Sequence, residues 1–148
     1  MKTFAEKAYS TTAVDSDITQ GRIQMMLEDL NINESRFTKV GDDYILEFIM
    51  RLDEHGEARK VKINIPIETD SSLSMQETKQ LKNKAFRVLY YNLKNKFVSI
   101  TNSLKTIEEE FLADLCITVD GKEMRIGDII LPQYKKSLEQ GKVKMIKE

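Results

Sequence analysis

The stretch YILEFIMRL (residues 44–52) has the two-residue period of a β-strand. One face of this strand would carry only large apolar side chains, which are Tyr44, Leu46, Phe48, Met50 and Leu52. The other face would carry Glu47 and Arg51, which alternate with Ile45 and Ile49. Since successive side chains of a strand point to opposite faces, we expect the first face to lie on a hydrophobic core.

Similar patterns lie on both sides of this strand. A short strand at 36–40 precedes Gly41-Asp42-Asp43, which is typical of a hairpin turn. A charged turn at 53–57 leads into ARKVKINIPI (58–67), in which alternate positions from Val61 to Ile67 are apolar. Pro66 suits the end or the edge of a strand, because proline has no N–H to donate. These residues predict a meander of three antiparallel strands.

Capping boxes mark three helix starts, with a Ser, Thr or Asp followed three residues later by Glu or Gln. They lie at Asp17–Gln20, Ser74–Glu77 and Thr106–Glu109. We expect helices from 17 to about 31, from 75 to 102 and from 106 to about 115. A small hairpin turning at Asp120-Gly121 follows, and then a short helix and a basic end.

The order of these elements predicts an α+β fold, a three-stranded antiparallel meander with a long basic helix and shorter helices packed on one face and a small C-terminal hairpin. Residues 1–16 are expected to be loosely ordered, and residues 17–148 to form a single domain. The 148 residues include one cysteine, no apolar leader and no run long enough to span a membrane. We therefore expect a cytoplasmic protein without disulfides, in the host cytoplasm if it is viral.

Catalytic patterns are weak. The single histidine, His55, lies in the charged turn, and Cys116 follows an apolar helix face, which is typical of a buried structural thiol. No glycine-rich phosphate loop is present. Glu47 is the single acidic residue recognised on a strand, so a metal-dependent nuclease lacks its second carboxylate. We predict no enzyme, no metal and no cofactor, and keep the nuclease as a third hypothesis.

The long helix 75–102 carries the strongest functional pattern. Between Thr78 and Ile107 there is no Asp or Glu, although Lys+Arg (23) and Asp+Glu (24) nearly balance in the whole chain. At 100° per residue, Phe86 and Phe97 fall in an apolar sector, while an outward line collects four other residues. These are Lys84, Arg87, Tyr91 and Lys94. Tyr90 lies at the edge of the apolar sector.

This outward line has two interpretations. Lysines on an exposed helix face commonly do no more than keep a protein soluble. Alternatively, cations with interleaved aromatic rings suit single-stranded nucleic acid, whose phosphates need positive charge and whose bases stack on rings. Lys60 and Lys62, on the open face of the third strand, would add positive charge if they border the same cleft.

Three stretches carry a resemblance: VKINIP (61–66), AFRVLYYNLKNKF (85–97) and EEEFLADL (108–115). In plan, the chain resembles a group of small phage and archaeal-virus proteins found among replication genes. More distantly, it is similar to the archaeal ThermoDBP-like family of single-stranded DNA-binding proteins. The resemblance implies an aromatic binding cleft flanked by basic residues, and it assigns no role to any individual residue of this chain.

The leading hypothesis is a non-catalytic protein of phage or archaeal replication or recombination that binds single-stranded DNA with little sequence preference. Lys84, Arg87 and Lys94 would contact phosphates, and Tyr91 and Tyr90 would stack on bases. The competing hypothesis is a protein–protein adaptor or an inhibitor of a host enzyme, with the acidic helix start at 108–110 as its docking patch. The oligomeric state stays open, with a dimer as one option, and no membrane partner is expected.

Overall fold

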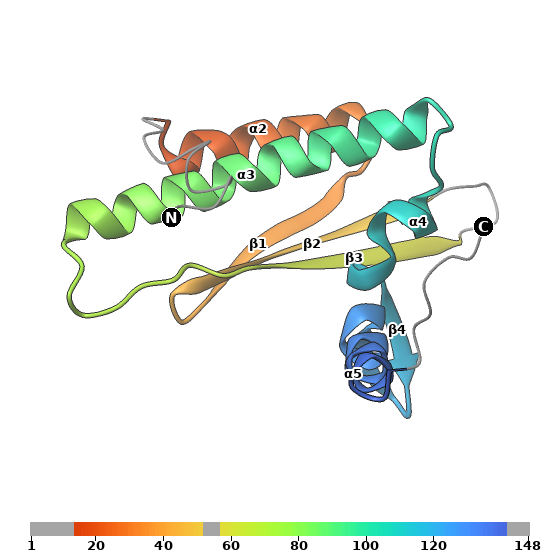
Figure 1. The fold of residues 1–148 in the computed structure, drawn as a ribbon. Coiled ribbons are helices and arrows are strands. Elements are labelled where there is room, and N and C mark those ends of the chain that lie inside the picture. The colour runs from red at the N-terminus through yellow and green to blue at the C-terminus, as the bar shows by residue number, and fades with distance from the viewer. Residues whose placement is uncertain (1–13, 52–56, 142–148) are drawn as a thin grey trace, which may run out of the picture.

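The computed structural model describes residues 14–51 and 57–141, and Figure 1 shows the arrangement of their helices and strands. In chain order the elements are α2 (Ser16–Asp29), β1 (Glu34–Val40), β2 (Asp43–Arg51), β3 (Ala58–Ile65), α3 (Met75–Thr101), α4 (Ile107–Phe111), the 3₁₀ turn η1 (Leu112–Asp114), β4 (Cys116–Val119), β5 (Lys122–Arg125) and α5 (Ile126–Glu139). The predicted α+β class is confirmed.

The three-stranded sheet has the order β1-β2-β3, and both pairs of neighbours are antiparallel, as the period-two patterns predict. Val40 pairs with Asp43, so a two-residue loop joins β1 to β2, with Gly41 at a left-handed φ of 63°. Most of the charged turn between β2 and β3, including Leu52 and His55, lies outside the described residues.

Helices α2 and α3 lie side by side and parallel on one face of this sheet (Figure 1). The start of α2 is joined to the third turn of α3 by a hydrogen bond that the backbone N–H of buried Ser16 donates to Asn83 Oδ1 at 2.9 Å. Helix α2 therefore begins at Ser16 with Asp15 at its N-cap, and the predicted capping box at Asp17–Gln20 is wrong. Residues 1–13 of the segment expected to be loosely ordered lie outside the described part of the chain.

The two other capping boxes are confirmed. At the start of α3, Glu77 N–H donates to Ser74 Oγ at 3.1 Å, and Ser74 N–H donates to the Glu77 carboxylate at 3.3 Å. Thr106 and Glu109 exchange the equivalent bonds at 3.1 Å each. Because both ends of each box are satisfied locally, these helix starts are encoded by four residues alone.

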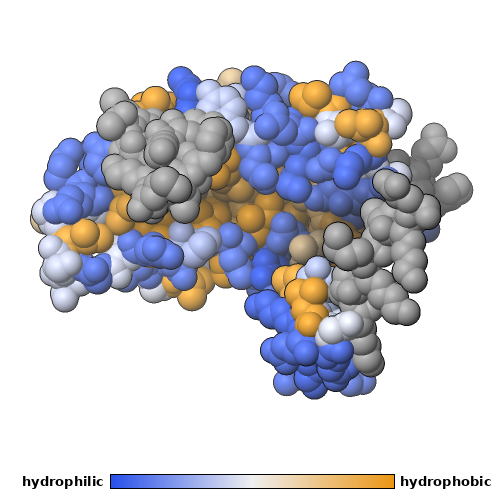
Figure 2. Space-filling view, in the orientation of Figure 1, coloured by the Kyte–Doolittle hydropathy of each residue, from blue (hydrophilic) through white to orange (hydrophobic). Residues whose placement is uncertain are grey.

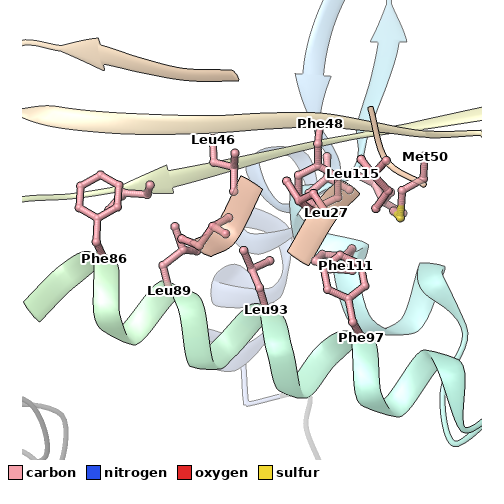
Figure 3. Packing of buried hydrophobic residues seen from close by; sticks show 14 of the residues in the cluster. Leu27, Leu46, Phe48, Met50, Phe86, Leu89, Leu93, Phe97, Phe111 and Leu115 are labelled. Atoms are coloured by element: carbon pink, nitrogen blue, oxygen red, sulfur yellow. The ribbon is translucent and has the colours of Figure 1, made fainter. Parts of the chain in front are cut away.

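The core lies between the sheet and α3, closed at one end by α4 (Figure 3). Phe48 of β2 meets the ring of Phe111 edge-on, with 5.7 Å between centroids, and Phe97 of α3 packs against both. Phe86 is fully buried further along α3. Phe86 and Phe97 are thus core residues, as the helical period predicts.

The β4–β5 hairpin and α5 lie on the other side of the sheet from α2 and α3 (Figure 1). Helix α4 ends at Phe111, earlier than expected, and continues as η1. The β4–β5 hairpin turns at Asp120-Gly121 as predicted, and both residues have positive φ, 51° and 79°. Helix α5 follows directly. No helix in the described part of the chain has the length and apolar character to cross a membrane.

Candidate nucleic-acid interface

The outward line of α3 starts and ends with two lysines. Lys84 is half-buried and Lys94 is exposed, and neither forms an ion pair with any residue that the structure describes. Other cations of the same helix are engaged: Lys79 pairs with Asp15, and Lys82 lies 4.9 Å from the centre of the Tyr44 ring. Lys84 and Lys94 thus differ from Lys79 and Lys82 in having no such partner among the described residues.

Between these lysines, Arg87 forms a compact cluster with two tyrosines. Its guanidinium carbon lies 5.6 Å from the ring centre of Tyr90 and 4.9 Å from that of Tyr91. Arg87 Nη2 also donates a hydrogen bond to the Tyr91 hydroxyl at 3.0 Å, and the two rings meet edge-on. The other terminal nitrogen, Nη1, is buried without a hydrogen-bond partner among the residues that the structure describes. The rings thus hold the cation while one donor stays unsatisfied.

A groove of about 510 Å³ runs between α2 and α3 beside this cluster. Its lining combines an apolar floor with charged rims, and comprises Arg22, Met25, Met26, Asp29, Leu30, Tyr90, Lys94, Phe97, Val98 and Thr101. Arg22 is a cation that the sequence interpretation missed. Its place on α2 is readable from the sequence, but its position near Lys94 depends on how the two helices pack. Asp29 gives the groove mixed charge.

Lys60 and Lys62 do not join the α3 residues. They alternate with Val61, which is fully buried on the core face, so they lie on the opposite face of the sheet from α3. Lys60 Nζ is also engaged there, at 3.1 Å from Glu47 Oε2 and 2.9 Å from Glu123 Oε2. The structure therefore does not unite the two sets of cations in one cleft.

Glu47 has its own partners on that open face. Burial raises its pKa, but hydrogen bonds from Arg36 and Lys60 outweigh burial and leave the pKa below its ordinary value. Glu123 of β5 is a second strand acid that the sequence interpretation overlooked. Lys60 lies between these two carboxylates, and no cluster of His, Cys, Asp or Glu suited to a metal ion exists among the described residues.

Cys116 is half-buried rather than fully buried. Burial, followed by the nearby charge of Glu123, raises the pKa of its thiol. The thiol is therefore protonated at neutral pH, and such a group is a poor nucleophile.

The glutamates at 108–110 are engaged within the molecule. Glu108 pairs with Arg59 of β3, and Glu109 is the carboxylate of the second capping box. Lys96 donates to the backbone oxygen of Glu110 at 2.6 Å, and its Nζ lies 3.6 Å from the Glu110 carboxylate. The acidic patch invoked for an adaptor thus anchors α4 to β3 and α3.

Comparison of the chain with models of known families, with curated proteins and with solved structures found no match. The resemblance given by the three short stretches therefore stays a prediction. A function has to be argued from the chemistry of the site itself.

Proposed function

We propose that the protein binds single-stranded DNA with little sequence preference, through the outward line of α3. The observation that supports this most directly is the Arg87 cluster, a cation held over two tyrosine rings on a helix face free of acids. Lys84 and Lys94 flank the cluster and have no ion pair within the described chain. Positive charge and stackable rings are the two requirements of single-strand binding.

The spacing of the cations suits a short length of DNA backbone. Lys84 and Lys94 are ten residues apart on one helix, a distance of about 15 Å at 1.5 Å per residue. This is the length of about four stacked nucleotides at 3.4 Å each. The backbone would follow α3 rather than the groove, because Asp29 on the groove rim repels phosphate.

The tyrosines would supply the base contacts. Tyr90 lines the groove, so a base turned toward α2 meets its ring and the apolar floor. Each base stacked on an aromatic ring contributes about 1–3 kcal/mol whatever its identity. This explains the expected lack of sequence preference, since the described site offers no arrangement dedicated to one base edge.

Fluorescence anisotropy with labelled mixed-sequence oligonucleotides tests the proposal. We expect binding that weakens as salt rises, and a preference for single strands over a duplex. The double variant Arg87→Ala/Tyr91→Ala should bind weakly while keeping the wild-type circular dichroism spectrum. Absence of binding at low salt, or affinity that does not change with salt, would overturn the proposal. Cleavage of the oligonucleotide with Mg²⁺ would favour the nuclease instead.

The groove supports a protein adaptor as the second candidate. Its exposed Met25 and Val98 lie between the charged rims formed by Arg22, Asp29 and Lys94, a surface that suits an amphipathic helix of another protein. A protein partner retained after nuclease treatment, and lost in Val98→Glu, would favour this candidate. Loss of the same partner on nuclease treatment would indicate that DNA bridges the two proteins, and would favour the DNA-binding proposal.

A further inference from the structure

The start of α5 is fixed to the rest of the molecule by specific contacts. A Cβ added to Gly127 would lie 2.7 Å from the carbonyl oxygen of Ala113 in η1, so only glycine allows this close approach. Arg125 then joins both sides of the contact, at 3.1 Å from Asp114 and 2.9 Å from Asp128. The direction in which α5 leaves the body is therefore set by tight packing and by ion pairs.

Beyond this fixed start, α5 carries an apolar stripe with no cover. At 100° per residue the stripe falls on the same side as Gly127. Its members are Ile130, Leu131, Tyr134 and Leu138, which are 48–52% exposed. Within α5, all of which the structure describes, Gly127 is the one buried residue. The stripe thus continues the side of the helix that η1 covers, but nothing described covers it past the first turn.

Helix α5 would be stabilised if a second surface buried this stripe. A helix of 14 residues is marginal on its own in water, and Pro132 weakens it further. The stabilising term for such a helix is burial of its apolar face. Leu112, in the 3₁₀ turn whose Ala113 packs on Gly127, is a further exposed apolar residue.

We propose that α5 pairs antiparallel with α5 of a second copy of this chain. The charges beside the stripe support this occupant. On one flank lie Asp128, near the start of the helix, Lys135, one heptad later, and Glu139 at its end. The Asp128 carboxylate is bonded to Arg125 of its own chain and is 54% exposed, so it can also accept from a lysine of a second copy. An antiparallel two-fold pair brings the same flank of each helix together in reverse order, so Asp128 of one chain faces Lys135 of the other.

In a parallel pair each charge would face the same residue of the other chain, so that like charges would repel. The other flank carries Gln133 and Ser137. Both are uncharged, so this flank favours neither the parallel nor the antiparallel pair. In the antiparallel pair Leu131 of one chain packs against Tyr134 of the other. Leu138 reaches the start of the opposite helix. The small extent of this surface implies a dimer of modest affinity.

This pairing is independent of the proposed DNA contact. The β4–β5 hairpin and α5 lie on the opposite side of the sheet from α3, as Figure 1 shows. In the space-filling view of Figure 2 they form a separate projection below the main body, with apolar side chains visible on it. A dimer joined through α5 therefore leaves both α3 faces accessible.

Sedimentation velocity of the full chain, from low micromolar to several hundred micromolar, tests the pairing. We expect a monomer–dimer equilibrium, and Leu131→Glu should raise its dissociation constant at least about tenfold. Lys136→Glu is the matched control, since it places the same side chain on α5 away from the stripe, and it should leave the constant within about twofold. A monomer at every concentration would overturn the proposal, as would a dimer insensitive to Leu131→Glu. Monomeric binding to anionic lipid vesicles, lost in Leu131→Glu, would assign the stripe to a membrane surface and equally overturn it.

Cross-linking tests the orientation. In a Cys116→Ser background, a mixture of Asp128→Cys and Lys135→Cys chains should form a disulfide dimer faster than either variant alone. A parallel pair would instead cross-link each variant with itself, and this result would contradict the antiparallel arrangement.

Discussion

The salt dependence of DNA binding follows directly from the cations of α3. If Lys84, Arg87 and Lys94 each neutralise one phosphate, three counterions are displaced from the strand. For single strands the slope of log K against log salt is about −0.7 per phosphate neutralised, so the wild type should show about −2.1. The double variant Lys84→Gln/Lys94→Gln retains one contact and should show about −0.7.

These slopes translate into affinities that are easily distinguished. When salt rises fourfold, the wild type should lose about eighteenfold in affinity and the double variant about threefold. Glutamine keeps much of the length of lysine and suits a helix, so the fold should be retained. Both lysines lack ion pairs in the described chain, so their replacement removes no internal contact of this kind.

Anisotropy titrations at four salt concentrations measure the slope. The matched control is Lys62→Gln/Lys122→Gln, which removes the same charge from the opposite face of the sheet and from β5. This control should keep the wild-type slope. A double variant that keeps a slope near −2.1, or a control that loses as much as the α3 variant, would show that the outward line of α3 is not the phosphate path.

Three further predictions concern the fold. Phe86→Ala removes a fully buried ring and should lower the free energy of unfolding by about 3–5 kcal/mol, measured by urea denaturation. Gly127→Ala forces α5 away from the Ala113 carbonyl and should lower the urea midpoint, whereas Gly141→Ala, which meets no neighbouring atom but has a positive φ, should cost about 1 kcal/mol. Glu47→Gln should lower the midpoint at pH 7. Because the folded pKa of Glu47 is depressed, its contribution is present above the unfolded pKa of about 4.3, so the difference from the wild type should shrink as pH falls below about 4. An equal difference at pH 7 and pH 3 would contradict this linkage.

The strands and the long helix were predictable because their signals are local. Alternation at 44–52 fixes which face of β2 is buried, and the Ser74–Glu77 box is satisfied within four residues. The start of α2 was mispredicted for the opposite reason. Asp17 looks like a cap, yet the N-cap is Asp15, two residues earlier, and Ser16 bonds to Asn83 of a helix distant in the sequence. No local pattern encodes that contact.

The candidate site also has one part that local sequence predicts and another part that depends on tertiary packing. The outward line of α3 follows from helical period alone, so Lys84, Arg87, Tyr91 and Lys94 could be grouped in advance. Arg22 and Lys94 line one groove because α2 lies parallel to α3, and the sequence does not predict this packing. The separate location of Lys60 and Lys62 depends on which face of the sheet receives the helices.

The described contacts also separate structural cations from available ones. Where the fold uses a lysine of α3, another element supplies its acid, as Asp15 does for Lys79 and Glu110 for Lys96. A face that serves only solubility needs exposed lysines and nothing more. Arg87 departs from that expectation, because it is half-buried against two rings and leaves a buried donor unsatisfied. Solubility alone does not account for this packing, and the Arg87→Ala/Tyr91→Ala variant tests whether the proposed DNA site does.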